Sequence, residues 1–437
     1  MADATTDTRA TLRHLFDAAV AAAHPAGLLA AYLPAPPKGR IILLGAGKAA
    51  GSMIAAAEAH YLDTLGLPKD RLTGLGVARQ GYGCATRIVP VLEAGHPMPD
   101  QAGVDATAKI LDLAGDAGPD DLVLALLSGG GSANWIAPAG ALTLAEKQAI
   151  TRALLRSGAV IGEINCVRKH LSRIKGGRLA ALAKPARLVS LAISDVPRDE
   201  ASAIASGPTV PDPTTLADAR AIVAKYGIDL PASARALLED PAMETPKPGD
   251  PLFAEAPFTI FARPADSLAA AAEAAKAAGY EPVSLGADVE GEAREVAAAH
   301  AAMAKKLRDE GRRAVILSGG ELTVTIRGKG RGGPNQEYAL ALALALALDG
   351  AKGIAAVAGD TDGTDGGGGA ASDPAGAFVD ETTLARARAA GLDPAAMLAD
   401  NDSTGFFEGI GDLLTPGPTL TNVNDLRAIL IDPAGAA

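Results

Sequence analysis

The sequence predicts an α/β protein built from two Rossmann-like α/β/α domains with mostly parallel sheets and an interdomain cleft. In both halves of the chain, short β-rich runs end in glycine loops and are followed by helical stretches, an alternation typical of parallel sheets. A proline-rich segment without apolar periodicity separates the two halves. The length of 437 residues favours two domains over one.

Three strand, loop and helix units occupy the first half, which we assign to an N-terminal domain of residues 1–240. They are RIILLGAGKAAGSMIAAAEAH, LVLALLSGGGSANW and ARLVSLAISDVPRDE. In such folds, ligands bind at the carboxyl ends of the strands. The loops that follow these strands are therefore the first candidates for a binding site.

The segment 241–257, PAMETPKPGDPLFAEAP, contains five prolines and is predicted to be a linker. Beyond it, PFTIFA, DSLAAAAEAAKAAG, EPVSLG, EAREVAAAHAAMAKKLRDEG and RRAVILSGGELTVTIRG repeat the alternation, which predicts a second α/β domain over residues 258–437. LLSGGGS in the first domain and ILSGGE in the second both end a strand in a Ser-Gly-Gly turn. We expect these two loops to face the shared cleft.

The composition indicates a globular protein, because the net charge is −11 and 48% of residues are hydrophobic. The acidic balance argues against nucleic acid as a partner. The two cysteines, Cys84 and Cys166, form no disulfide framework or zinc spacing and fit a reducing cytosol. The N-terminus lacks the pattern of a signal peptide, and the apolar run 339–348 is about half of a bilayer crossing. We therefore expect a cytoplasmic protein without a membrane partner.

The first glycine loop, GAGKAAGS, follows the strand RIILL and opens a helix. Gly45, Gly47 and Ala50 satisfy the dinucleotide pattern GxGxxA, but the next strand ends near Arg79, where an NAD site would place an acid. Lys48 lies at the helix N-terminus, where free N–H groups and an ammonium group both favour an anion. The alternative is a solvated lysine on a tight turn.

The second glycine loop, SGGGSAN, has three consecutive glycines after a buried strand. Such a loop lets backbone N–H groups surround a phosphate or a carboxylate, although a plain flexible turn has the same composition. The residues predicted to bind phosphate here are Ser128, Gly129, Gly130, Gly131 and Ser132.

The segment HLSRIKGGRLA and its flank concentrate basic residues in an acidic protein. A local basic cluster attracts anions despite the net charge, and a solvated helix face is the alternative interpretation. The basic residues are Arg168, Lys169, Arg173, Lys175 and Arg178.

Acidic residues follow three of the predicted strands. Asp195 comes at the end of LAISD, a position that suits a metal ligand or a general base. Glu321 ends ILSGGE, and a helix-capping acid is the alternative there. Asp360 ends the strand GIAAVAG, where one carboxylate together with substrate phosphates would suit Mg²⁺. Asp362 and Asp365 follow in the glycine-rich loop and have the simpler alternative of stabilising turns.

The segment GKGRGGPNQEYALAL places Pro334 at the first position of a helix, where its missing N–H costs nothing. With Gly332 and Gly333 before it and Asn335 after it, the helix start is predicted to bind a second anion, and Arg331 lies on the approach loop. A solvated hairpin tip is the alternative.

Taken together, these motifs resemble the glycerate 2-kinase family, the class II glycerate kinases whose C-terminal region is called the MOFRL domain. The resemblance covers the chain from about Gly45 to Asp425. It rests on GAGKAA, EAGHPMPD, LLSGGGSANW, HLSRIKGGRLA, ISDVPRDEASAIASGPTVPD, LSGGELTVTIRGKGRGGPNQE, AGDTDGTDG and DNDSTGFFEGIGDLLTPGPTLTNVNDL.

The resemblance implies ATP-dependent phosphorylation of the 2-hydroxyl of D-glycerate, with Mg²⁺, in a site between two Rossmann-like domains. Phosphoryl transfer requires mainly positioning and neutralisation of developing charge, which agrees with glycine loops, basic side chains and carboxylates. One departure is that Pro334 stands where many members have arginine. The roles that we expect are Lys48 on the transferring phosphoryl group, Arg173 and Lys175 on the glycerate carboxylate, Asp195 and Asp360 on Mg²⁺, and Glu321 and Arg331 as further catalytic residues.

Two other functions stay open at this point. Some relatives of the family carry the name hydroxypyruvate reductase, so an NAD(P)H oxidoreductase is the second candidate, supported by GxGxxA and by Arg79. A noncatalytic sensor of a sugar acid or nucleotide is the third. The expected partners are small molecules, and the sequence leaves a monomer and a homodimer both open.

Overall fold

The computed structural model describes residues 4–347, 352–366 and 370–433. The chain forms two compact units. We call Pro25–Phe261 the N-terminal unit, and Met1–His24 with Ala262–Ala437 the C-terminal unit.

The N-terminal unit contains a six-stranded sheet of order β3-β2-β1-β4-β5-β6. The pairs that join β3, β2, β1, β4 and β5 are parallel, which confirms the predicted parallel sheet. This is the strand order of a dinucleotide-binding fold, in which ligands bind where the order reverses, between β1 and β4. Its strands are β1 (Ile41–Ala46), β2 (Leu72–Arg79), β3 (Val91–Ala94), β4 (Leu122–Leu127), β5 (Arg187–Ile193) and β6 (Phe258–Ala262).

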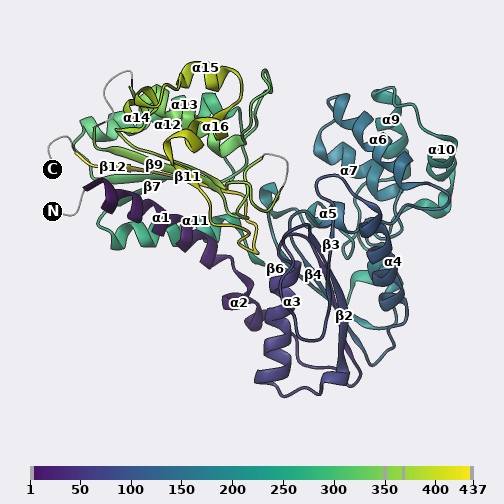
Figure 1. Ribbon diagram of the computed structural model, residues 1–437. Helices are drawn as coiled ribbons and strands as arrows, with labels where there is room; N and C mark the ends of the chain where they lie inside the picture. The colour runs from purple at the N-terminus through teal and green to yellow at the C-terminus, as the bar shows by residue number, and fades with distance from the viewer. Residues whose placement is uncertain (1–3, 348–351, 367–369, 434–437) are drawn as a thin grey trace. The chain divides into compact units, whose positions relative to one another are not determined.

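Helices surround this sheet, and four of them form a separate bundle (Figure 1). The side chains of α6, α7, α9 and α10 make an apolar cluster of their own, which includes Leu154, Val167, Ala219 and Leu238. The helices of this unit are α2 (Pro25–Leu28), α3 (Ala50–Glu58), α4 (Gln101–Gly115), α5 (Gly131–Asn134), α6 (Leu144–Arg156), α7 (Ile161–His170), α8 (Arg178–Leu182), α9 (Leu216–Lys225) and α10 (Ala232–Glu239).

The C-terminal unit contains a mixed sheet of order β11-β10-β9-β12-β8-β7, which corrects the prediction of a second mostly parallel sheet. Only β7 and β8 pair in parallel, because β12 returns between β8 and β9, and β10 runs back along β9. The carboxyl ends of β8 and β9 and the start of β12 therefore meet at one edge. The strands are β7 (Glu281–Ser284), β8 (Ala314–Ser318), β9 (Ile354–Asp360), β10 (Gly376–Val379), β11 (Leu413–Leu414) and β12 (Asp425–Ile431).

Helices cover both faces of the mixed sheet, α12 and α13 on one and α1 and α11 on the other (Figure 1). Alternate residues of β8 serve the two faces: Ile316 packs with α12 and α13, whereas Val315 and Leu317 pack with α1 and α11. The helices are α1 (Ala4–Ala22), α11 (Pro264–Ala277), α12 (Ala293–Asp309), α13 (Pro334–Ala347), α14 (Thr383–Ala389), α15 (Pro394–Ala399) and α16 (Ser403–Ile410).

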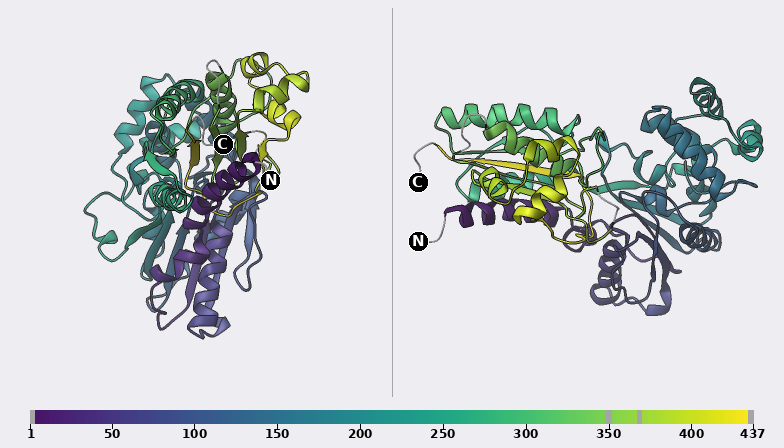
Figure 2. Two further views of the ribbon diagram at one scale, coloured as in Figure 1. Left: turned by 90° about the vertical axis from the view of Figure 1, so that its left-hand side faces the viewer. Right: turned by 45° about the horizontal axis from the view of Figure 1, so that its top comes forward.

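The boundaries of the units differ from those predicted. Helix α1 belongs to the C-terminal unit, because Leu12, Leu15 and Phe16 are buried against α11 and the mixed sheet, and Figure 2 shows α1 along this sheet. The segment 241–257 is part of the N-terminal unit, where Leu252 and Phe253 pack on the core, and β6 completes the sheet of that unit. The chain therefore passes between the units near residues 24 and 261 and not in the proline-rich segment.

Within the described ranges, no single helix is long and apolar enough to cross a membrane, and one bent pair, 8–22 with 25–32, meets that criterion by length and composition alone.

Candidate active site

The loops after β1 and β4 interlock at the point where the strand order of the N-terminal sheet reverses. The backbone N–H of Lys48 donates to the carbonyl of Gly129 (2.8 Å), and the N–H of Ala49 donates to the hydroxyl of Ser128 (3.0 Å). The same hydroxyl donates to the carbonyl of Ala46 at 3.2 Å. GAGKAA and SGGGS, two of the predicted binding loops, therefore form one structure. Gly45 is the penultimate residue of β1.

Gly47 allows the two loops to approach each other. Its φ is +106°, and a Cβ atom here would overlap the Ser128 carbonyl oxygen and hydroxyl. In a dinucleotide site, the corresponding glycine leaves room for the pyrophosphate. Here the protein itself fills that room. At the end of β2, Arg79 is buried with its guanidinium carbon 5.0 Å from the centre of the Tyr82 ring.

Replacing Gly47 by alanine should disrupt this interlock. Because the left-handed backbone and the overlap with backbone atoms both oppose a side chain, we expect a loss of about 3 kcal/mol in the free energy of unfolding, together with loss of activity. Gly66→Ala is the control, because Gly66 has φ +65° with no neighbouring atom within 4 Å. Urea denaturation of both variants measures the difference, and equal losses would show that Gly47 makes no special contact.

The glycines of SGGGS fit against side chains from two other strand ends. Gly130 has φ +84°, and a Cβ atom there would lie 3.1 Å from the His96 ring and 3.5 Å from Cγ of Lys48. His96 is a site neighbour that was not among the residues predicted from the sequence. Its signal was its place directly after the short strand β3, whose carboxyl end lies at the same edge of the sheet.

The segment that follows β5 carries Asp195 and an unusual backbone. Asp195 is half-buried, two residues after the strand that pairs with β4. Non-glycine residues in the left-handed region cost free energy and cluster at functional sites. Four of them follow Asp195: Arg198, Asp199, Ala205 and Ser206, with φ of 58°, 54°, 50° and 63°.

The structure separates the two basic residues that were predicted to bind the glycerate carboxylate. Lys175 is buried, and its ammonium donates to the carbonyl of Ser132 at 2.8 Å. Burial, and then the charges of Lys147 and Arg168, hold the pKa of Lys175 well below its usual value. Arg173 is exposed and lines a cavity of about 940 Å³ with residues of α4 and α8 and none from the two interlocked loops.

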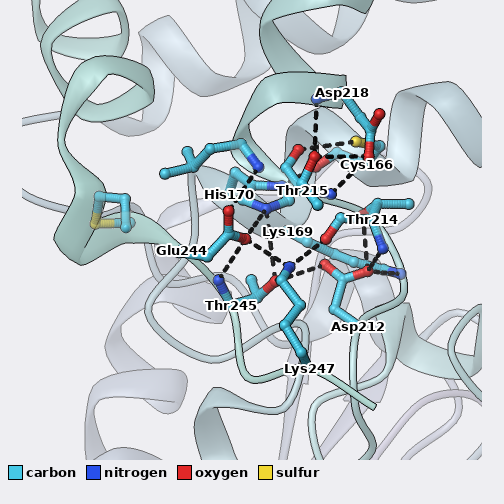
Figure 3. Close-up of polar contacts among 12 residues, drawn as sticks. Cys166, Lys169, His170, Asp212, Thr214, Thr215, Asp218, Glu244, Thr245 and Lys247 are labelled. Atoms are coloured by element: carbon cyan, nitrogen blue, oxygen red, sulfur yellow. Dashed lines mark hydrogen bonds and ion pairs between the residues drawn. The ribbon is translucent and has the colours of Figure 1, made fainter.

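Other basic residues of this motif are used in the fold (Figure 3). Lys169 forms a buried ion pair with Asp212 (3.1 Å), and His170 contacts Glu244 at 3.1 Å. The hydroxyl of Thr245 donates to the second oxygen of Asp212 at 3.1 Å. These contacts fix α7 to the segment predicted to be a linker.

In the C-terminal unit, Asp365 caps helix α13, so the predicted anion site at this helix start is filled by the protein. Its carboxylate accepts from the backbone N–H groups of Asn335 (3.0 Å) and Gln336 (2.9 Å), and from both side-chain amides. Gly332 lies in the loop before the helix, and a Cβ atom at Gly333 would overlap the Asp365 backbone. Gly332, Gly333 and Asn335 thus make loop and helix contacts, and their role in phosphate binding stays a prediction.

The acidic groups beside this helix are buried with one arginine. Burial raises the pKa of Asp365 to about 7 and raises that of Asp425 as well. Arg427 binds Asp425 (2.9 Å) and donates to the Ser318 hydroxyl (3.1 Å) and to the carbonyl of Gly319. The end of β8 is therefore tied to the start of β12.

Asp362 holds a turn of the glycine-rich loop, as the simpler alternative predicted, whereas Asp365 caps α13 instead. Asp360, for which a metal site was predicted, makes a similar turn contact. The N–H of Asp362 donates to Asp360 at 2.9 Å, and the N–H of Thr364 donates to Asp362 at 2.7 Å. Residues 367–369 of this loop lie outside the described residues. Asp360 ends β9 and is half-buried.

Two other predicted catalytic residues lie at the surface of the C-terminal unit, and the two predicted metal ligands belong to different units. Glu321 is exposed directly after the Ser-Gly-Gly turn, and Arg331 pairs with Glu408 on α16 at 2.8 Å. Asp195 and Asp360 belong to different units. Among the described residues, no three His, Cys, Asp or Glu side chains gather in a way that would hold a metal ion.

Comparison with known proteins covers nearly all of the chain. Residues 11–239 match the family described as domain of unknown function DUF4147, and residues 314–425 match the MOFRL family. A protein of Agrobacterium vitis named "Putative hydroxypyruvate reductase" is 52% identical over 97% of this chain and 94% of its own length. The "D-glycerate 2-kinase" of Thermotoga maritima is 38% identical over 90% of this chain and 91% of its length. The crystal structure of a glycerate kinase from Thermotoga maritima superposes with a TM-score of 0.84 at 36% identity, covering 98% of this chain and 100% of that one.

Proposed function

Because the chain belongs to the glycerate 2-kinase family, we propose that it transfers the terminal phosphoryl group of ATP to the 2-hydroxyl of D-glycerate, giving 2-phospho-D-glycerate and ADP. The observation that carries the proposal is the interlock of GAGKAA with SGGGS, which brings Lys48 to a glycine loop at the switch point of the sheet. Relatives named glycerate kinase at 38% and 36% identity support this reaction.

The residues of the N-terminal unit provide the positioning and positive charge that phosphoryl transfer needs. In our proposal, the Lys48 ammonium neutralises charge on the transferring phosphoryl group, and the N–H groups of Gly129 and Gly130 orient its oxygens. The N–H of Gly131 donates to the Ser128 carbonyl at 3.2 Å and shapes the loop. Asp195, at the end of β5, orients the acceptor hydroxyl or holds the metal ion. His96, against Gly130, is a further neighbour of the reacting groups.

A Mg²⁺ ion would supply charge neutralisation at the phosphates. Mg²⁺ characteristically takes one or two protein carboxylates and completes its shell with substrate phosphates and water. A single half-buried carboxylate at a strand end, such as Asp195 or Asp360, fits this mode of coordination. Arg331 stays a candidate for phosphate, because its pair with Glu408 is exposed on both sides and costs little to break.

The second candidate function is an NAD(P)H-dependent hydroxypyruvate reductase. The name of the 52% identical relative and the strand order of the sheet favour it. Against it, SGGGS fills the space beside Gly47 that a pyrophosphate would need. Arg79, which would suit the 2′-phosphate of NADPH, is buried at the end of β2 with its guanidinium carbon 5.0 Å from the centre of the Tyr82 ring. We therefore retain the kinase as the proposal.

A parallel assay separates the two reactions. Purified protein with D-glycerate, ATP and Mg²⁺ should release ADP, and the product should be 2-phosphoglycerate and not 3-phosphoglycerate. A second reaction contains hydroxypyruvate and NADH and should show no oxidation of NADH. NADH oxidation without ADP release would overturn the proposal and identify the reductase.

A further inference from the structure

The turn 204–207 contacts the SGGGS loop at Gly131 and Ser132. The hydroxyl of Ser206, which is fully buried, lies 2.6 Å from the hydroxyl of Ser132. The methyl group of Ala205 fits against Gly131, where a Cβ atom would be only 2.9 Å away. The contact between these segments is therefore close and specific.

This contact requires a backbone conformation that costs free energy. Ala205 and Ser206 are consecutive non-glycine residues in the left-handed region, which L residues avoid for steric reasons. Hydrogen bonds hold them there, since the carbonyl of Ser206 accepts from the N–H of Gly176 (3.0 Å) and that of Gly207 accepts from the N–H of Gly177 (2.7 Å). Such conformations persist where the surrounding structure fixes them, and they often mark a functional position.

The end of the loop at Ser132 has a different electrostatic environment from the end at Gly130. Lys175 donates to the Ser132 carbonyl, and Lys147 donates to the carbonyl of Leu171. The hydrogen bonds that these two buried lysines make within the described residues go to carbonyl groups and not to carboxylates. Burial holds the pKa of Lys175 low, and an anion at Ser132 would favour the protonated form of Lys175, so binding of an anion there would restore an ammonium charge beside the loop.

From this geometry we propose that Ser132 contacts the carboxylate of the acceptor and that Ser206 is the positioning residue that orients the Ser132 hydroxyl. A carboxylate only accepts hydrogen bonds, so Ser132 must donate to it, and Ser206 must then donate to Ser132. The half-exposed side chain of Ser132 makes it the member of the pair that reaches a ligand. This inference rests on the proposed function and assigns a subsite to its acceptor.

Kinetics of Ser132→Ala, Ser206→Ala and the double variant test the inference. We expect each single variant to raise KM for D-glycerate about tenfold, the effect of one lost hydrogen bond, while KM for ATP stays unchanged. Because Ser206 acts through Ser132, the double variant should equal Ser132→Ala alone. Additive effects, or an unchanged KM for D-glycerate, would contradict the inference.

Two control variants separate orientation from stability. Ser206→Gly also lacks the hydroxyl but relieves the left-handed backbone, so it should show the same rise in KM with a higher Tm than Ser206→Ala. Ser190→Ala breaks another buried hydroxyl pair of this unit, Ser190 with Thr209 at 2.8 Å, and should lower Tm without changing either KM. A change of KM in Ser190→Ala would mean that loss of stability alone explains the results.

Failure of the inference and failure of the proposed function give different results. A wild-type protein that phosphorylates D-glycerate alongside variants with normal KM would overturn only the inference. If the wild-type protein releases no ADP, the increase in its Tm on adding D-glycerate replaces KM as the readout for the same variants. Absence of any such increase would overturn the inference together with the function.

Discussion

Lys48→Ala should lower kcat for D-glycerate phosphorylation by about 10²–10³-fold, the usual effect of removing one group that stabilises the charge of a transition state. Lys48 begins the loop that interlocks with SGGGS, and its Cγ lies beside Gly130. The two loops therefore fix the backbone of Lys48 and the first part of its side chain. Because the backbone N–H of residue 48 makes the contact to Gly129, alanine keeps the interlock while it removes the charge.

Steady-state kinetics and denaturation of the same samples check this prediction. Lys48→Arg keeps a positive charge in a different shape and should recover part of the activity. Lys38→Ala removes an exposed lysine of the same unit and should behave as the wild-type protein. Normal turnover of Lys48→Ala would refute the role that we give this residue.

Asp365→Ala should cost about 3 kcal/mol in the free energy of unfolding, because it leaves the backbone N–H groups of Asn335 and Gln336 buried without their acceptor. The two side-chain amides keep other acceptors, Asp425 for Asn335 and the backbone carbonyl of residue 365 for Gln336. Asp393→Ala is the matched control. Asp393 caps α15 through the N–H groups of Ala395 and Ala396 but is exposed, so its loss should cost about 1 kcal/mol. Equal losses would show that burial adds nothing to the role of Asp365.

The stability of the wild-type protein should also depend on pH through Asp365. Since burial raises the pKa of Asp365 to about 7, the native protein keeps a proton that the unfolded chain releases near pH 4. The free energy of unfolding should therefore fall as pH rises from about 4 to 7, by at most about 1.4 kcal/mol per pH unit, and then level off. Urea denaturation across this range should show a shallower slope for Asp365→Ala, with a remainder from Asp425, whose pKa is also raised. An unchanged slope would show that groups other than Asp365 cause the pH dependence.

Residues next to a strand end were the part of the site that the sequence predicted well. Strand and loop signals lie within a few residues of each other, so Lys48, Ser128 and Asp195 were correctly placed at the carboxyl edge of one sheet. Their chemical roles stay predictions, as do the cytoplasmic location and the oligomeric state. Short-range turns were equally readable, and Asp362 forms the local turn that was its alternative.

Contacts between segments that lie far apart in the sequence could not be predicted. Asp365 caps a helix that begins at Pro334, and Ser206 meets Ser132 across 74 residues. Nothing in either local pattern specifies the partner. Arg173 and Lys175 are two residues apart and similar in charge, yet the fold exposes one and buries the other. Helix α1 lies in the unit formed by the far end of the chain.

By itself, the sequence determined the α/β class, the parallel N-terminal sheet, the glycine loops at its edge and the family, because these depend on local propensity, periodicity and motif order. The tertiary structure decided the mixed C-terminal sheet, the unit boundaries, the filled helix start at Asp365 and the interlock beside Gly47. Those features depend on which apolar surfaces pack against each other and on which hydrogen-bond donors lie next to which acceptors. Only the folded chain fixes such pairings, because the local sequence of many segments is equally compatible with them.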